Sequence, residues 1–262
     1  MRVLKRLTRV VVLVVGVAAP NVSNAQDTIF FPPTDRIAIR HMPSIPAIEL
    51  APRVHVHTVV GSTGSVSFGE FDSAGIAPLH HHTREQADVG LSGQLDMTVG
   101  SNVEPLPPGF GIIVPANVRH SIGNTHAGVR TVIEFHTVRR PDLVPPRPAL
   151  TFPAAAEPVS LEANRRLVAR IDAGDGSTLT GETCTMRSRR IATSVVDVHP
   201  DATPTELFMY VARGIVRLAA SGSTSTLRPG MLVIVPAAVR NVRLSSADAD
   251  GASVIEFSVR AR

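Results

Sequence analysis

The chain is poor in aromatic residues, in cysteine and in clustered charge. Its 262 residues include no tryptophan, one tyrosine and one cysteine, Cys184, so an internal disulfide is excluded. No run of basic residues is interleaved with aromatics, which argues against a nucleic-acid surface. The sequence also lacks a Ser-His-Asp order, a phosphate-binding loop and a paired-carboxylate motif.

The first 25 residues have the pattern of a secretory signal peptide. An apolar run from Val10 to Ala19 is too short to span a bilayer comfortably, and small residues precede a cleavage point after Ala25. We therefore expect a periplasmic or secreted protein, with an uncleaved N-terminal anchor as the alternative. The run is preceded by four basic residues: Arg2, Lys5, Arg6 and Arg9.

Removal of this segment brings the net charge close to zero. The segment contains four of the 26 basic residues and none of the 22 acidic ones. The remaining basic run, Arg187-Ser188-Arg189-Arg190, is expected to be a solvated loop face. We expect a small-molecule substrate, no nucleic-acid partner and no stable membrane span after cleavage, because no other segment is long and apolar enough.

Valine, isoleucine, threonine, glycine and proline are abundant, and this mixture favours a β-rich fold. Short apolar runs separated by turn residues follow one another between residues 54 and 137, a pattern typical of a sandwich or barrel. Prolines mark residues 26–50 as an extended N-terminal arm. Six further prolines mark residues 141–158 as a linker.

The second half of the chain repeats the first. Gly230 and Pro236 lie 121 residues beyond Gly109 and Pro115, within two similar stretches, 106–120 and 227–241. A constant offset over this length indicates duplicated domains, which we place at residues 51–140 and 159–262.

Histidines are concentrated in the first of these domains. His80 and His82 are two residues apart, so both side chains leave one face of a strand. Together with His120 they suit a divalent transition metal, with Glu85 or Gln86 as a fourth ligand. A second pair, His55 and His57, has no third ligand nearby and is expected to be an ordinary pair of strand histidines.

These residues resemble the two motifs of the cupin family. Gln86 stands where the family has Glu, Asn117 stands where it has Gly, and Gly75 is displaced by one residue. The remaining motif positions match the family pattern: His80, His82, Gly93, Gly109, Pro115, His120 and Asn124.

The resemblance implies an all-β fold of two tandem jelly-roll barrels, a bicupin. It also implies one divalent transition metal, either Mn, Fe, Ni, Zn or Cu, held by His80, His82, Gln86 and His120. Gln86 is preferred over Glu85 because its distance from Gly93 matches the family spacing. Because cupins commonly dimerise, a homodimer is an additional expectation, and the N-terminal arm is expected to lie across a neighbouring subunit.

The repeat lacks the ligands, so the second domain is expected to be free of metal and to act as a scaffold. Glu134 recurs as Glu256, which assigns it a structural role. Arg84 and His136 change between the copies and are therefore candidates for contact with substrate. The four ligand positions, His80, His82, Gln86 and His120, become Asp201, Thr203, Leu207 and Asn241.

Three neutral imidazoles and an amide leave the charge of a metal uncompensated, which suits a Lewis acid. The set resembles that of cupins that rearrange unsaturated sugar acids and of some cupin lyases. We therefore expect an isomerase or lyase acting on a small carbonyl or carboxylate compound. The alternatives are a dioxygenase that cleaves a flavonol- or diketone-like substrate, and a non-catalytic protein that binds a small ligand or metal.

Overall fold

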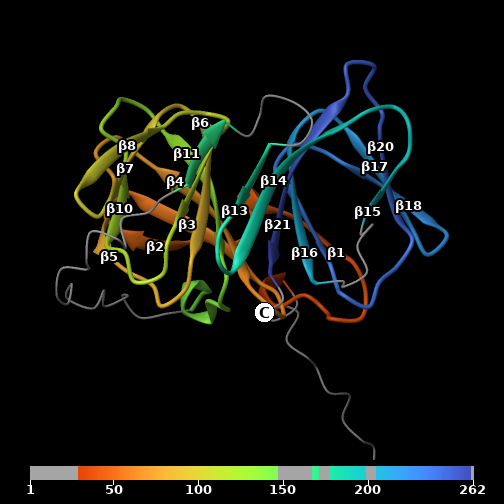
Figure 1. The fold of residues 1–262 in the computed structure, drawn as a ribbon, viewed down its shortest axis with the longest axis horizontal. Helices are drawn as coiled ribbons and strands as arrows, with labels where there is room; N and C mark the ends of the chain where they lie inside the picture. The colour runs from red at the N-terminus through yellow and green to blue at the C-terminus, as the bar shows by residue number, and fades with distance from the viewer. Residues whose placement is uncertain (1–28, 147–166, 171–176, 199–204, 261–262) are drawn as a thin grey trace, which may run out of the picture.

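A computed structural model describes residues 29–146, 167–170, 177–198 and 205–260. These ranges are built of β-strands, with two short 3-10 helices, η1 (Met42–Ser44) and η2 (Pro141–Leu143). The strands form two barrels side by side, as the sequence predicted (Figure 1). The predicted signal peptide and most of the predicted linker lie outside the described residues.

The first barrel consists of a large sheet, in the order β12-β9-β6-β11-β4-β3-β2, and a small sheet, in the order β5-β10-β7-β8. All neighbouring strands within it are antiparallel. Its strands are β2 (Ile48–Ala51), β3 (Val54–Val60), β4 (Ser65–Phe71), β5 (Ile76–His80), β6 (Gln86–Ser92), β7 (Leu95–Val99), β8 (Asn102–Leu106), β9 (Phe110–Val114), β10 (His120–Gly123), β11 (Arg130–His136) and β12 (Leu167–Arg170).

The second barrel has the same plan, with a large sheet β1-β19-β16-β21-β14-β13 and a small sheet β15-β20-β17-β18. Its strands are β1 (Ala38–His41), β13 (Thr178–Thr180), β14 (Cys184–Ile191), β15 (Val196–Val198), β16 (Leu207–Arg213), β17 (Val216–Ala220), β18 (Ser223–Leu227), β19 (Met231–Val235), β20 (Val242–Ser246) and β21 (Ala252–Val259).

The two large sheets exchange edge strands. β1 belongs to the N-terminal arm yet pairs with β19 of the second barrel, with Ala38 opposite Ile234. β12, which the sequence places in the second domain, pairs with β9 of the first barrel, with Leu167 opposite Ile113. In this chain the arm therefore covers the edge of the chain's own second barrel, which protects that edge from pairing with other strands.

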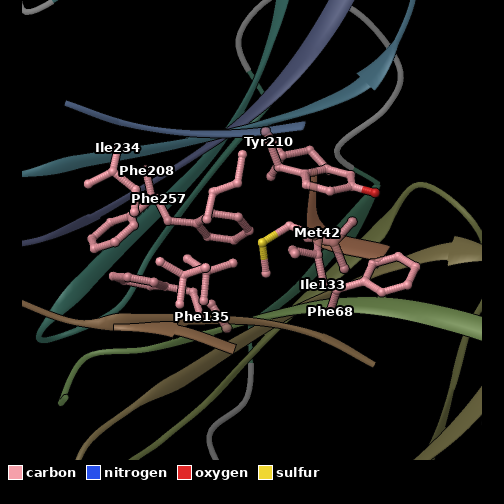
Figure 2. Packing of buried hydrophobic residues seen from close by; sticks show 14 of the residues in the cluster. Met42, Phe68, Ile133, Phe135, Phe208, Tyr210, Ile234 and Phe257 are labelled. Atoms are coloured by element: carbon pink, nitrogen blue, oxygen red, sulfur yellow. The ribbon is translucent and has the colours of Figure 1, made fainter. Parts of the chain in front are cut away.

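The two barrels share one apolar core where the outer faces of their large sheets meet. Phe135 of the first barrel packs against Phe208 and Phe257 of the second, with ring centroids 5.3 Å apart in each pair. Met42 of η1 fills the space beside them and is fully buried (Figure 2). Each buried phenylalanine contributes about 1.5–3 kcal/mol through burial, so the shared core strongly favours one fixed arrangement of the barrels.

Alternation along the strands separates this shared core from the barrel interiors. On β3, Val54 belongs to the interior of the first barrel and Val56 lines the pocket inside it, while Val59 belongs to the shared core. His57 also faces outward, where its ring contacts the carbonyl oxygen of Ile45 and the carboxylate of Glu70. His57 is thus a strand histidine with two oxygen partners.

The basic run 187–190 is not a solvated loop, contrary to the prediction. It lies within β14, and Arg187 and Arg189 both form ion pairs with Glu256 on the neighbouring strand β21. The prediction failed because the acidic partner is distant in sequence. Within the described ranges, the structure contains no helix with the length and hydrophobicity needed to cross a membrane.

Candidate metal centre

The three predicted histidines meet at one place in the first barrel. His80 ends β5, His82 follows it, and His120 begins β10, directly opposite His80 in the antiparallel pair. One nitrogen from each of the three rings lies within 4.8 Å of the others. The ring centroids are 4.4 to 5.1 Å apart. The pairing of β5 with β10, with His80 opposite His120, thus brings the triad together.

Backbone carbonyls fix the proton positions of two of these rings. The Nδ1 atom of His80 lies 2.6 Å from the Pro78 oxygen, and that of His120 lies 2.9 Å from the Val118 oxygen. A carbonyl can only accept, so Nδ1 carries the hydrogen in both rings. Nε2 therefore keeps a lone pair, the arrangement that metal-binding histidines require.

Gln86 adds an oxygen to the triad. Its amide nitrogen donates to Oδ1 of Asp88 at 2.9 Å, so the amide oxygen Oε1 is directed elsewhere. Oε1 of Gln86 and Nε2 of His120 are both buried and have no hydrogen-bond partner among the described residues. Buried acceptors normally have a partner. Two orphaned acceptors beside two further imidazoles therefore fit a divalent transition metal.

Glu85, the rival for the fourth ligand, is occupied by the second barrel. Its carboxylate accepts hydrogen bonds from the backbone N–H groups of Glu182, Thr183 and Cys184, at 2.7, 2.6 and 3.1 Å, and from the Thr183 hydroxyl. Gly181 begins this turn, and a side chain there would stand 2.4 Å from the Glu85 carboxylate. Glu85 therefore holds a turn of the other barrel, and Gln86 faces the histidines.

Burial keeps the histidines uncharged. It is the main cause that lowers the pKa of His82 to about 2 and that of His120 to about 3, and the neighbouring positive charges lower them further. The pKa of His80 is lowered for the same reason. At neutral pH the three rings are therefore neutral and able to bind a metal without first losing a proton.

Two buried carboxyl groups lie beside the triad. Asp88 and Glu134 face each other across β6 and β11. Burial raises the pKa of Glu134 to about 7, and burial together with the Glu134 charge raises the pKa of Asp88 well above its usual value. Glu134 lies 3.8 Å from Nε2 of His136, whose own pKa is lowered well below the usual range by burial.

Of the two substrate contacts predicted from the sequence, His136 lines the pocket beside the triad and Arg84 does not. Glu134 and Arg140, which the sequence did not suggest as contacts, line it as well. Arg140 lies 3.4 Å from Nδ1 of His82 and pairs with Asp142 at 2.7 Å. Alternation from Gln86 was sufficient to place Asp88 inside the barrel. The structural role predicted for Glu134 does not account for its position in the pocket.

The second barrel has a different interior. Leu207 and Met209 pack in its apolar core at the positions of Gln86 and Asp88, and the side chain of Asn241 is exposed. Asp201 and Thr203 lie outside the described residues. Within the described part of the chain, the His80, His82 and His120 group is the one cluster of His, Cys, Asp or Glu residues that could hold a metal ion.

The comparisons with known proteins agree with the fold. Residues 68–134 match the Cupin domain family model. No curated protein matches the sequence. Residues 68–134 are therefore similar to a cupin domain, and the two barrels of the chain give it a fold like that of the solved two-barrel structures described next.

Solved two-barrel structures resemble the chain at low sequence identity. Protein Ylba from E. coli has a TM-score of 0.65 at 10% identity, covering 88% of this chain and 93% of its own. Salicylate 1,2-dioxygenase from Pseudoaminobacter salicylatoxidans, in complex with gentisate, has a TM-score of 0.59 at 12% identity, covering 86% and 82%. The 11S globulin from Wrightia tinctoria, described with an auxin binding site, has a TM-score of 0.61 at 11% identity, covering 87% and 85%. These likenesses establish the fold.

Proposed function

We propose that this protein is a metal-dependent isomerase or lyase acting on a small carbonyl or carboxylate compound outside the cytoplasm. One observation carries the proposal: a neutral donor set of three histidines and an amide lies beside groups that can move a proton and bind a carboxylate. The first set suits a Lewis acid. The second set consists of Glu134, His136 and Arg140, which line the same pocket.

His80, His82, Gln86 and His120 are the residues that would hold a divalent transition metal. When bound, the metal supplies positive charge that stabilises an enolate or carboxylate oxygen of the substrate. Asp88 keeps the Gln86 amide turned so that its oxygen faces the histidines. The carbonyls of Pro78 and Val118 hold two of the imidazoles in the required tautomer.

Proton transfer is assigned to Glu134 and His136. A group that exchanges protons near neutral pH works best with a pKa near the working pH, and Glu134 has a pKa raised to about 7. His136 is uncharged, and its Nε2 atom is buried without a hydrogen-bond partner among the described residues. Arg140 is the group that would bind a substrate carboxylate. To do so it would release its present partner, Asp142.

Substrate entry requires a movement of the pocket wall. The space beside the triad has a volume of about 20 Å³, close to that needed by one water molecule. Arg140 and Leu143 close it from the side of η2, and Leu50 closes it from β2. We therefore assign η2 the role of a cover that shifts when a substrate binds.

The experiment is a deuterium-exchange assay. Protein with a measured metal content is mixed with α-hydroxy aldehydes, ketones and unsaturated uronic acids in D₂O, and the substrates are followed by NMR. Incorporation of deuterium next to a carbonyl, or elimination of water, supports the proposal. Both should disappear in Glu134→Gln at unchanged metal content, whereas Arg84→Gln is a matched control expected to retain activity. Activity that survives confirmed removal of the metal contradicts the proposal.

The likeness to salicylate 1,2-dioxygenase favours a dioxygenase as the second candidate. An oxygen electrode separates the two activities, because a dioxygenase consumes O₂ with flavonol, diketone or dihydroxyaromatic substrates and an isomerase or lyase does not. Binding of a ligand without turnover in either assay would instead favour a binding protein.

A further inference from the structure

A second cavity lies between the two barrels. It has a volume of about 320 Å³, within the range of small-molecule sites, and domain interfaces are a common place for such sites. Its walls come from β6, β14, β16 and β21 and from the turns before β9 and β19. None of its lining residues lines the pocket at the histidine triad.

The cavity lies where the duplicated halves face each other, because several of its lining residues occur in pairs with the offset of 121. Gly109 pairs with Gly230, for example. In both halves the strand carries a bulge here, at Leu91 in the first barrel and at Ala212 in the second. Bulges are common beside functional sites because they redirect side chains.

The paired positions differ in chemistry, so the two walls differ as well. The first barrel contributes an apolar wall of Val89, Leu91 and Pro108. The second barrel has Tyr210 in place of Val89 and the small Ala212 in place of Leu91. The replacement of leucine by alanine opens space, and the replacement of valine by tyrosine adds a hydroxyl group.

The Tyr210 hydroxyl has no hydrogen-bond partner among the described residues, although the side chain is only 5% exposed. Figure 2 shows the oxygen at the end of the ring that points away from Phe208 and Phe257. Burial raises the pKa of Tyr210, so the phenol is neutral and able to donate. Tyr210 lines the cavity, so a ligand bound there can accept this hydrogen bond in place of water.

We propose that this cavity binds a small monocarboxylate with an apolar body. Arg213 is exposed at its edge and makes no hydrogen bond or ion pair with another described residue, so it can bind the carboxylate together with the Tyr210 hydroxyl. The apolar body packs against Val89, Leu91 and Pro108. This site is independent of the metal centre and of the reaction proposed there.

Tyr210 is also the reporter for the test, because the chain has no other tyrosine and no tryptophan. Cyclohexanecarboxylate, which does not absorb in the tyrosine band, is titrated into the full-length protein while Tyr210 fluorescence is recorded, with calorimetry in parallel. We expect one saturable site. Cyclohexanemethanol, which has the same shape but no carboxylate, should bind at least about tenfold more weakly. Equal binding of acid and alcohol, or no saturable binding, overturns the proposal.

Three variants locate the site. Arg213→Gln and Tyr210→Phe should each weaken binding by about tenfold in calorimetry. Ala212→Leu should abolish binding, because the larger side chain, which the first barrel has at the equivalent position, fills the space. The double variant His80→Ala/His82→Ala should bind as tightly as the unmodified protein. Thermal unfolding checks that each variant is folded. If Ala212→Leu is folded and still binds, or if only the histidine variant loses binding, the cavity is not the site.

Discussion

The interiors of the two barrels differ most clearly at one pair of equivalent residues. In the first barrel, Glu134 has Ser67 and Asp88 as its neighbours across the sheet. In the second barrel, Glu256 has Arg187 and Met209 in the same places. One carboxyl group therefore lies beside a second acid, and the other is neutralised by arginines.

This difference indicates how one duplicated fold serves two purposes. The second barrel pairs its buried charge and fills the rest of its interior with aliphatic side chains, which gives a stable scaffold. The first barrel keeps unpaired acceptors and acids with raised pKa values around its histidines. Such unsatisfied groups destabilise a fold and are characteristic of functional sites.

The largest expected effect is on metal content. Elemental analysis of protein purified from its native compartment should find about one divalent metal per chain, and His80→Ala/His82→Ala should lose it, because two of the four ligands are removed. The matched control is Asn241→Gly, at the position equivalent to His120. Asn241 has a φ of 57°, which glycine adopts without strain, so this variant should keep its metal. Loss of metal in Asn241→Gly but not in the histidine variant would place the metal in the second barrel instead of the first.

Substitution of the two equivalent glutamates should affect stability differently. Glu256→Gln leaves Arg187 and Arg189 without their buried partner and should lower the free energy of unfolding by about 3 kcal/mol. Glu134→Gln in metal-free protein should not destabilise the fold, because it removes a carboxyl group that lies next to Asp88. Urea denaturation of both variants measures the difference.

The effect of Glu134→Gln should depend on pH. The pKa of Glu134 is about 7 in the folded protein and lies near its usual value in the unfolded chain. The unfolded chain therefore loses this proton first, and the natural protein loses stability as the pH rises from about 4.5 to 7. The relative stability of metal-free Glu134→Gln should rise over the same range and then remain constant. A difference that is independent of pH would contradict the raised pKa.

Removing the charged contact between the barrels should lower stability by the same amount whichever barrel carries the substitution. Glu206 accepts hydrogen bonds from the backbone N–H groups of Ser62 and Thr63 and from the Thr63 hydroxyl, as Glu85 does from the opposite turn. Glu85→Gln and Glu206→Gln should each cost about 2 kcal/mol, because a buried, charge-assisted acceptor is lost. Both variants should keep their metal. Loss of metal in Glu85→Gln, without loss in Glu206→Gln, would make Glu85 a ligand after all.

The sequence predicted the fold and the triad because a repeat, a residue spacing and the resemblance to the cupin motifs all mark them. The offset of 121 revealed the duplication, and the spacing of His80 and His82 placed both rings on one face. Glu85 and Glu206 are also related by this offset, but the groups that each carboxylate binds lie in turns of the opposite barrel. Contacts of this kind depend on how the sheets pack together, which no local pattern encodes.

Arg140 and the exchanged strands were missed for related reasons. Arg140 follows the last strand of the first barrel, and its place in the pocket depends on the path of the chain into η2. The exchange of β1 and β12 depends on which sheet edge is available in the folded protein. A strand pattern indicates that a segment extends, but it does not identify the partner strand.

The smallest expected effect concerns Asn117, which replaces a glycine of the cupin motif. Its φ is 62°, and its backbone N–H donates to the carbonyl of His82, so this turn supports one of the triad residues. Asn117→Gly should change the free energy of unfolding by less than about 0.5 kcal/mol, whereas Asn117→Ala should cost about 1 kcal/mol because alanine disfavours positive φ. The equivalent Ala238 has no positive φ, so Ala238→Gly should be destabilising by about 0.4–1 kcal/mol through the entropy of the unfolded chain. A nearly neutral response to glycine at Asn117 and a destabilising one at Ala238, measured by denaturation, would show that only the first barrel keeps the turn geometry of the motif.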